Sequence, residues 1–205
     1  MARKAPKVTE TLPTFEILFE NSFRLAGELY PGLAPNTVGN FIQLANSGFY
    51  DGAEITLVVP ESIILMDHPE KTVPYCIRGE CELNGCDYNT GHVCTGSVCF
   101  FHGPQYDSGR SGFFIVLNDE SRTVRMVEGA YALFGQLLEG LSFAELLSRT
   151  RCDGNGTPVL CHKIRSIRVE TNGRTFPFET CPEPEDTLDR VILNQESMSD
   201  LSNRD

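Results

Sequence analysis

Eight cysteines are the residues with the most obvious chemical potential in this chain of 205 residues. Five of them lie within one short region: Cys76, Cys81, Cys86, Cys94 and Cys99. Thiolates bind metals, form disulfides or act as nucleophiles. Paired zinc ligands are usually two to four residues apart, and here four or more residues intervene, at the wide end of this range or beyond it. The spacing therefore favours reduced thiols packed in core and loops, and we predict no metal site and no cofactor.

A second segment of interest runs from Phe49 to Pro69 and reads FYDGAEITLVVPESIILMDHP. A turn at residues 50–52 leads into a strand, with apolar residues alternating at Ala53, Ile55, Leu57 and Val59. Pro60 ends this strand, and a second apolar run follows at residues 63–66. The segment therefore predicts two neighbouring strands.

Short apolar segments separated by turn residues predict mainly β structure around these two strands. Further strands are expected at residues 14–20, 24–30, 96–101, 113–117, 131–136 and 160–170. One helix is expected to begin at Pro35 and to stop at Gly48, and a second to begin at a capping box with Ser142 as N-cap and Glu145 three residues later. Many short strands with only two helices predict a closed antiparallel barrel.

The domain organisation follows from the same patterns. Residues 1–13 are predicted to be a flexible N-terminal arm, and residues 14–172 a single barrel domain. Asn172-Gly173 predicts a tight turn, after which Thr175 to Phe178 are expected to add a hairpin strand. Acidic residues dominate the chain after Pro182, so residues 173–205 are predicted to end in a disordered tail.

Bulk composition excludes several classes of function. A net charge of −11 argues against a general nucleic-acid-binding protein, which would carry a basic face. No apolar run reaches the length of a membrane span, and the basic N-terminus has no apolar segment of the kind that follows in secretory signals. We therefore expect a cytoplasmic protein, a monomer, with neither nucleic acid nor membrane as a partner.

The order of these motifs resembles the cyclophilin family of peptidyl-prolyl cis-trans isomerases over residues 14–171. The motifs that carry the resemblance are GELY at 27–30, APNTVGNF at 34–41, GFYDG at 48–52, SGRSGFFI at 108–115 and ALFGQLLEG at 132–140, with a bacterial-type insertion near Arg78-Gly79-Glu80. The resemblance implies an eight-stranded antiparallel β-barrel capped by two α-helices. It also implies binding of proline-containing peptides and catalysis of X–Pro isomerisation.

The same resemblance maps a family active site onto this chain and shows several replacements. Leu57 occupies the position of the family's catalytic arginine, Leu65 and Gly112 the positions of glutamines, and Tyr131 that of a histidine. Phe101 and His102 stand for an alanine and an asparagine that contact substrate backbone, and Ser62 for a pocket phenylalanine. Phe114 matches the other pocket phenylalanine. The predicted substrate-binding residues are Ser62, Ile63, Leu65, Phe101, His102, Gly112, Phe114, Met126, Val127 and Tyr131.

Three hypotheses about function stay open at this point. The chain is a peptide-binding cyclophilin-like protein whose isomerase activity is weak or lost, because a transition-state donor is missing at Leu57. Arg110, Arg122 and Arg125 are expected in loops near the pocket rim, and the alternative is a working isomerase with a rebuilt site that uses Arg110 or Arg125 and desolvation of the pocket. A third alternative is a thiol-rich metal-binding or redox-responsive protein.

Overall fold

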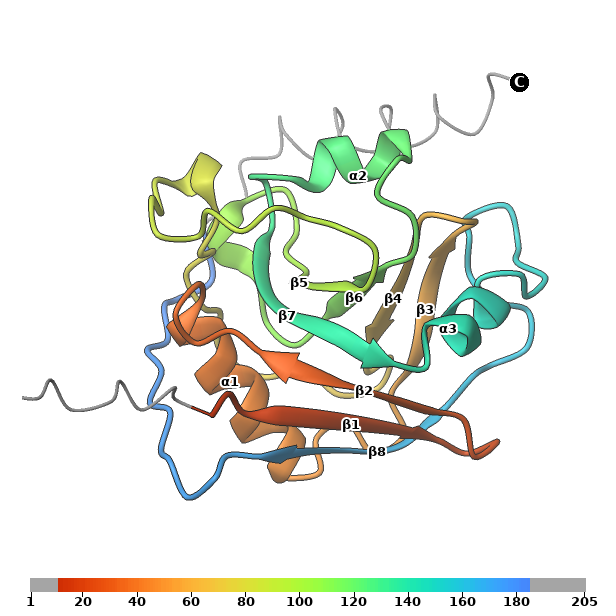
Figure 1. Ribbon diagram of the computed structural model, residues 1–205, viewed down its shortest axis with the longest axis horizontal. Coiled ribbons are helices and arrows are strands. Elements are labelled where there is room, and N and C mark those ends of the chain that lie inside the picture. Colours follow the sequence, from red (N-terminus) through yellow and green to blue (C-terminus); the bar gives the residue numbers. More distant parts are fainter. Residues whose placement is uncertain (1–10, 185–205) are drawn as a thin grey trace, which may run out of the picture.

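The computed structural model describes residues 11–184. Eight antiparallel strands form one curled sheet (Figure 1), in the order β3-β4-β6-β5-β7-β2-β1-β8. The strands are β1 Thr14–Phe19, β2 Arg24–Leu29, β3 Glu54–Val59, β4 Ile63–Asp67, β5 Ser97–Phe100, β6 Phe113–Val116, β7 Ala132–Glu139 and β8 Ile164–Glu170. The helices are α1 Pro35–Asn46, α2 Arg122–Val127 and α3 Leu141–Leu147, with 3-10 turns η1 Glu82–Asn84 and η2 Tyr106–Ser108. The prediction of a mainly β fold with eight antiparallel strands is confirmed.

The prediction of a closed barrel was wrong, because the sheet is an open half-barrel. Its end strands, β3 and β8, meet only near an isolated bridge between Glu54 and Lys163. The residues before Ile164 contact β3 through two further backbone hydrogen bonds. The Ile55 amide donates to the His162 carbonyl at 3.3 Å, and the Val58 amide donates to the Gly156 carbonyl at 2.8 Å. Strand β8 begins at Ile164, later than the predicted residue 160.

The helices differ from the prediction in number and in one start. Helix α1 begins at Pro35 as expected. The short helix α2 was missed, and Ser121 caps it by accepting a hydrogen bond from the Val124 amide. Helix α3 starts at Leu141 after Gly140, whose φ of 91° suits glycine, so Ser142 lies inside the helix and is not its cap. None of the helices in residues 11–184 has the length and apolar character needed to cross a bilayer.

The main core lies between the concave face of the sheet and α1. Phe41 of α1 is 1% exposed and forms the centre of an aromatic cluster. Its ring centroid lies 5.2 Å from those of both Phe113 and Phe134 and 5.6 Å from that of Tyr50. Burial raises the pKa of Tyr50, which stays neutral and donates a hydrogen bond to the Ser111 carbonyl at 2.8 Å.

The predicted strand after the Asn172-Gly173 turn is not formed. The turn itself is present, since both residues have positive φ and the Arg174 amide donates to the Thr171 carbonyl at 3.1 Å. The chain then passes beside α1 (Figure 1) and does not fold back along β8. The predicted flexible arm falls mostly on residues 1–10, and the predicted acidic tail on residues 185–205, which lie outside the described residues.

All eight cysteines are free thiols. Within residues 11–184, no three His, Cys, Asp or Glu side chains come together in a way that could hold a metal ion. Cys99 is fully buried, and burial raises the pKa of its thiol, which makes it a packing residue.

Candidate functional site

The strands β3 to β7 carry two apolar rows that face opposite sides of the sheet. On the concave side, Met66, Phe113 and Phe100 are cross-strand neighbours and belong to the main core. On the convex side, register pairs Leu57 with Leu65, Leu65 with Phe114, Phe114 with Cys99, and Cys99 with Leu133. Because side chains alternate along a strand, this second row forms a separate apolar surface.

We call the buried residues around this row the convex cluster. It consists of Ile63, Leu65, Val93, Cys99, Phe114, Val116, Val124, Val127 and Leu133, with Leu33, Leu57, Val59, Phe101 and Tyr131 partly buried against it. Four of the predicted binding residues, Ile63, Leu65, Phe114 and Val127, therefore lie together inside it. The structure brings together residues from four strands, α2 and the loop before β5.

A break in the register of β3 decides on which side Leu57 lies. The pairing with β4 shifts between Ile55 and Leu57, so one residue is inserted there. Ile55 consequently packs in the main core, while Leu57 turns to the convex cluster. The sequence pattern had placed both residues on one face of a regular strand, and this was wrong because the bulge reverses the alternation.

Tyr131 occupies the middle of the predicted binding groove. Its ring is stacked on His102 at 4.4 Å between centroids, lies parallel to Phe101 at 6.3 Å, and meets Phe114 edge-on at 5.2 Å. Burial raises the pKa of Tyr131, so its ring stays uncharged at neutral pH. The chain's own aromatic side chains thus occupy the space beside Phe114.

Phe101 also closes the space above Gly112. A Cβ atom at Gly112 would lie 3.3 Å from Phe101 Cδ1 and 3.2 Å from Asp67 Oδ2, so a side chain there requires these two neighbours to shift by a few tenths of an ångström. Asp67 is a polar neighbour that the sequence patterns did not single out. Its Oδ1 accepts hydrogen bonds from Ser111 Oγ and the His68 amide, both at 2.8 Å. Burial raises the pKa of this carboxyl group, and both hydrogen bonds oppose the shift.

Two predicted binding residues, Ser62 and His102, make hydrogen-bond contacts within the chain. Ser62 is 3% exposed, and its hydroxyl lies 2.8 Å from that of Ser121, the cap of α2. The ring nitrogens of His102 lie 2.7 Å from the Gly103 carbonyl oxygen and 2.8 Å from that of Ala130. Neither ring nitrogen of His102 is therefore directed at a ligand.

Met126 lies on the exposed side of α2. Its side chain is 54% exposed on α2, whereas Val124 and Val127 of the same helix are buried in the convex cluster. In a short helix whose buried positions are three residues apart, the residue between them points outward. Met126 is therefore solvent-accessible on α2, and its place in the pocket stays a prediction.

Of the arginines expected near the pocket rim, Arg110 is held by contacts with other segments. Arg110 Nη1 donates to the Val73 carbonyl at 2.7 Å and to that of Tyr75 at 3.3 Å, while its Nη2 pairs with Glu183 at 2.7 Å. These contacts hold Arg110 against the segment before η1. Arg122 and Arg125 are exposed on α2.

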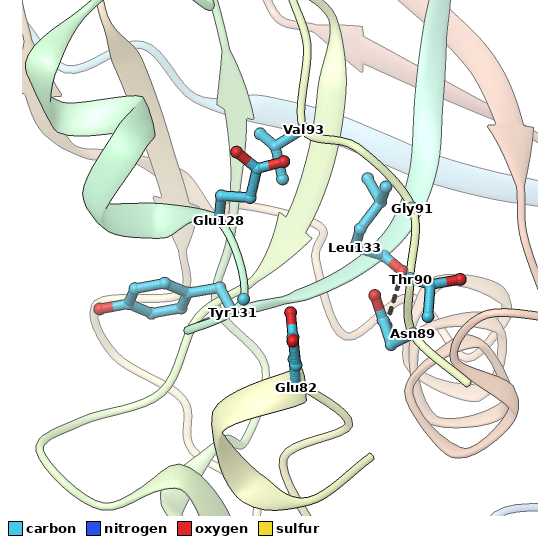
Figure 2. Close-up of a pocket in the computed structure, with 9 residues that line it drawn as sticks. Glu82, Asn89, Thr90, Gly91, Val93, Glu128, Tyr131 and Leu133 are labelled. Atoms are coloured by element: carbon cyan, nitrogen blue, oxygen red, sulfur yellow. Dashed lines mark hydrogen bonds between the residues drawn. The ribbon is translucent and has the colours of Figure 1, made fainter. Parts of the chain in front are cut away.

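A small cavity lies beside the convex cluster, and Figure 2 shows its residues. It has a volume of about 240 Å³ and shares Val93, Tyr131 and Leu133 with the cluster. Its polar lining includes Glu82 and Glu128, and Asn89 donates a hydrogen bond to the Leu133 carbonyl at 3.1 Å (Figure 2). These residues were missed because they lie on a loop, on η1 and after α2, without any local motif.

Comparison with known proteins gives one consistent result. The family described as cyclophilin type peptidyl-prolyl cis-trans isomerase/CLD matches residues 15–169. Peptidyl-prolyl cis-trans isomerase B of Bacillus subtilis is 33% identical over 141 residues, which cover 67% of this chain and 92% of that protein. Peptidyl-prolyl cis-trans isomerase ppi1 of Schizosaccharomyces pombe is 30% identical over 144 residues, which cover 67% of this chain and 86% of that protein.

Solved structures show the same fold. A cyclophilin type peptidyl-prolyl cis-trans isomerase of Cryptosporidium parvum matches with a TM-score of 0.65 and 19% identity, covering 79% of this chain and 99% of that one. A further structure of that protein, in the presence of the dipeptide Ala-Pro, matches with the same TM-score of 0.65 and 18% identity. At such identities the structural likeness establishes the fold alone.

Proposed function

Because this chain belongs to the cyclophilin-type peptidyl-prolyl cis-trans isomerase family, we propose that it binds proline-containing peptide segments at the convex cluster and that its isomerase activity is weak or lost. One observation carries the second half of this proposal. Leu57 lies at the position for which the family resemblance requires an arginine, and its side chain packs on the apolar cluster. A leucine side chain has no hydrogen-bond donor for the prolyl amide.

The size of the expected loss follows from the chemistry of the reaction. Twisting an X–Pro amide has an uncatalysed barrier of roughly 18–20 kcal/mol, because conjugation is lost in the twisted state. A donor aimed at the amide stabilises that state, and removing one such donor costs about 2.7–4 kcal/mol, or roughly 10²–10³ in rate. The leucine at position 57 is expected to reduce catalysis by at least this factor.

The environment of Leu57 also disfavours a donor from elsewhere. The loop before β8 covers this side chain, since a Cβ atom at Gly156 would lie 2.9 Å from Leu57 Cδ1. Arg110 is engaged with backbone carbonyls and with Glu183. These contacts argue against Arg110 as the replacement for the missing guanidinium.

Peptide binding is supported by the apolar character of the remaining surface. A proline ring needs an apolar slot, and Ile63, Leu65 and Phe114 supply one at adjacent positions on β4 and β6. Phe101 and Tyr131 would have to move aside for a ring to reach Phe114. Phe101 is only partly buried, so its movement costs mainly its stacking on Tyr131, about 0.5–1.5 kcal/mol.

The test measures isomerisation and binding separately. Exchange between the cis and trans forms of an Ala-Pro tetrapeptide is followed by NMR, with the Bacillus subtilis relative as a reference. We expect kcat/KM at least about 10²-fold below the reference, together with peptide-dependent shifts of the amide signals of Gly112 and Phe114. Activity within tenfold of the reference would refute the loss of activity, and unchanged amide signals at millimolar peptide would refute binding.

The second candidate is a working isomerase with a rebuilt site. The sequence relatives at 33% and 30% identity are both named as peptidyl-prolyl cis-trans isomerases, which favours this alternative. The same exchange experiment decides between the two, because only the second candidate predicts a rate close to that of the reference.

A further inference from the structure

The segment after β8 is held along α1 by specific contacts, and we call residues 174–183 the C-terminal strap. Figure 1 shows the strap passing beside α1. Gly39 of α1 allows this close approach, since a Cβ atom there would lie 2.8 Å from the Pro177 carbonyl oxygen and 2.9 Å from that of Phe176. The strap therefore packs on the helix through backbone atoms.

Polar and aromatic contacts fix the rest of the strap. The side-chain amide of Asn36 donates to the Glu179 carbonyl at 3.0 Å and accepts a hydrogen bond from the Glu179 amide at 2.5 Å. The rings of Tyr75 and Phe178 lie 5.9 Å apart, and Glu183 pairs with Arg110 at 2.7 Å. The strap thus connects α1 with the segment around Tyr75.

Cys181 of the strap lies directly opposite Cys76. The two residues form an antiparallel bridge and exchange both backbone hydrogen bonds, at 2.8 Å and 3.2 Å. In such a pair the Cα atoms are about 5.5 Å apart, which lies within the range of roughly 4.4–6.8 Å found in disulfides. Residues directly opposite on antiparallel segments also direct their side chains to the same face.

The two thiols differ in access. Cys76 is fully buried, whereas Cys181 is partly exposed at the surface. Cys181 is therefore the thiol that a soluble oxidant reaches first, and Cys76 is the second thiol, which reacts with the oxidised Cys181.

We propose that Cys76 and Cys181 are a redox site, at which a peroxide oxidises the two thiols to a disulfide that fastens the strap to the barrel. Hydrogen peroxide converts the Cys181 thiol to a sulfenic acid and releases one water molecule. The Cys76 sulfur then attacks the sulfenic sulfur, the S–S bond forms, and a second water molecule leaves. Two thiols and one peroxide thus give one disulfide and two water molecules, and a dithiol reductant reverses the change.

The surroundings of the pair determine how fast this reaction runs. Burial raises the pKa of the Cys76 thiol, and the charge of Arg110 acts against the shift. Burial, the Asp107 carboxylate and the neighbouring Cys76 raise the pKa of Cys181. Because the thiolate is the reactive form, oxidation is slow at neutral pH and accelerates as the pH rises.

Peptide mapping tests the proposal on the full-length protein. Trypsin releases each of these two cysteines in a peptide that contains no other cysteine. Cys76 lies in the peptide of residues 72–78, and Cys181 lies in that of residues 175–190. After treatment of the folded protein with hydrogen peroxide and blocking of free thiols, we expect mass spectrometry to find these two peptides linked. Reduction is expected to separate them, and the oxidised protein to unfold at a higher temperature than the reduced protein.

Two serine variants serve as controls. Cys181→Ser should form no link to the peptide 72–78 and should show no peroxide-dependent rise in unfolding temperature. Cys161→Ser removes an exposed cysteine elsewhere and should leave both results as in the wild type. Two results would overturn the proposal. In the first, both Cys76 and Cys181 are recovered as blocked free thiols; in the second, Cys181 is recovered as a sulfinic acid while Cys76 remains free.

Discussion

Phe101→Ala is the substitution that tests most directly whether the chain's own side chains cover the proposed binding surface. The ring stacks parallel to Tyr131 at 6.3 Å and crowds the space beside Gly112, where a Cβ atom would lie 3.3 Å from Phe101 Cδ1. Its removal should open the surface in front of Phe114. We therefore expect the variant to be less stable and to bind a proline peptide more tightly.

Both magnitudes follow from the position of the ring. Truncating a fully buried phenylalanine costs about 3–5 kcal/mol, and Phe101 is only partly buried, so a loss of about 1.5–2.5 kcal/mol in unfolding free energy is expected. In the variant the peptide no longer has to displace the stacked ring, so the binding free energy improves by the stacking energy of about 0.5–1.5 kcal/mol. This corresponds to an affinity gain of about 2- to 12-fold.

The measurements are urea denaturation for stability and NMR titration with an Ala-Pro tetrapeptide for affinity. Phe143→Ala is the matched control, because Phe143 of α3 is also half-exposed and stacks on Phe23 at 4.6 Å, outside the convex cluster. The control should lose stability without gaining affinity. If Phe101→Ala loses stability and its affinity stays at the wild-type value, Phe101 does not cover the binding surface.

Leu57→Arg in the Phe101→Ala background is expected to raise kcat/KM for an Ala-Pro peptide about 10²–10³-fold in the NMR exchange assay. Leu57→Lys in the same background lacks the planar guanidinium and should give a smaller gain. Equal gains in the two variants would contradict a specific role for the guanidinium. Phe114→Ala should lower the unfolding free energy in urea by about 3–5 kcal/mol, because Phe114 is 2% exposed, while Met126→Ala, at 54% exposed, should change it by less than about 0.5 kcal/mol. Similar losses in these two variants would show that Met126 is packed after all. Burial and a hydrogen bond to the Glu54 carboxylate raise the pKa of the Cys161 thiol to about 11. Glu54→Gln should therefore lower this pKa, increase the thiolate fraction at pH 8.5 and accelerate alkylation by iodoacetamide, followed by mass spectrometry; an unchanged rate would mean that the carboxylate does not control the thiol.

Much of the fold was predictable because its signals are local. Pro35 marks the start of α1, and the turn at Asn172-Gly173 forms as its residue types require. Strand β6 lies within the range expected from its apolar run. The order of the motifs was sufficient to identify the family, which the family match over residues 15–169 confirms.

The sequence by itself determined the order of the eight strands along the chain, the family and the presence of leucine at position 57. Only the tertiary structure decided the side of the sheet on which Leu57 lies, since that depends on a bulge relative to β4. It also decided that Tyr131 stacks on His102 and lies parallel to Phe101, that Arg110 pairs with Glu183, and that Cys76 lies opposite Cys181. The physical reason is that the side of Leu57 depends on the pairing register of β3 with β4, which residue types alone do not fix. The other contacts join segments distant in sequence, so they arise only when the whole sheet has formed.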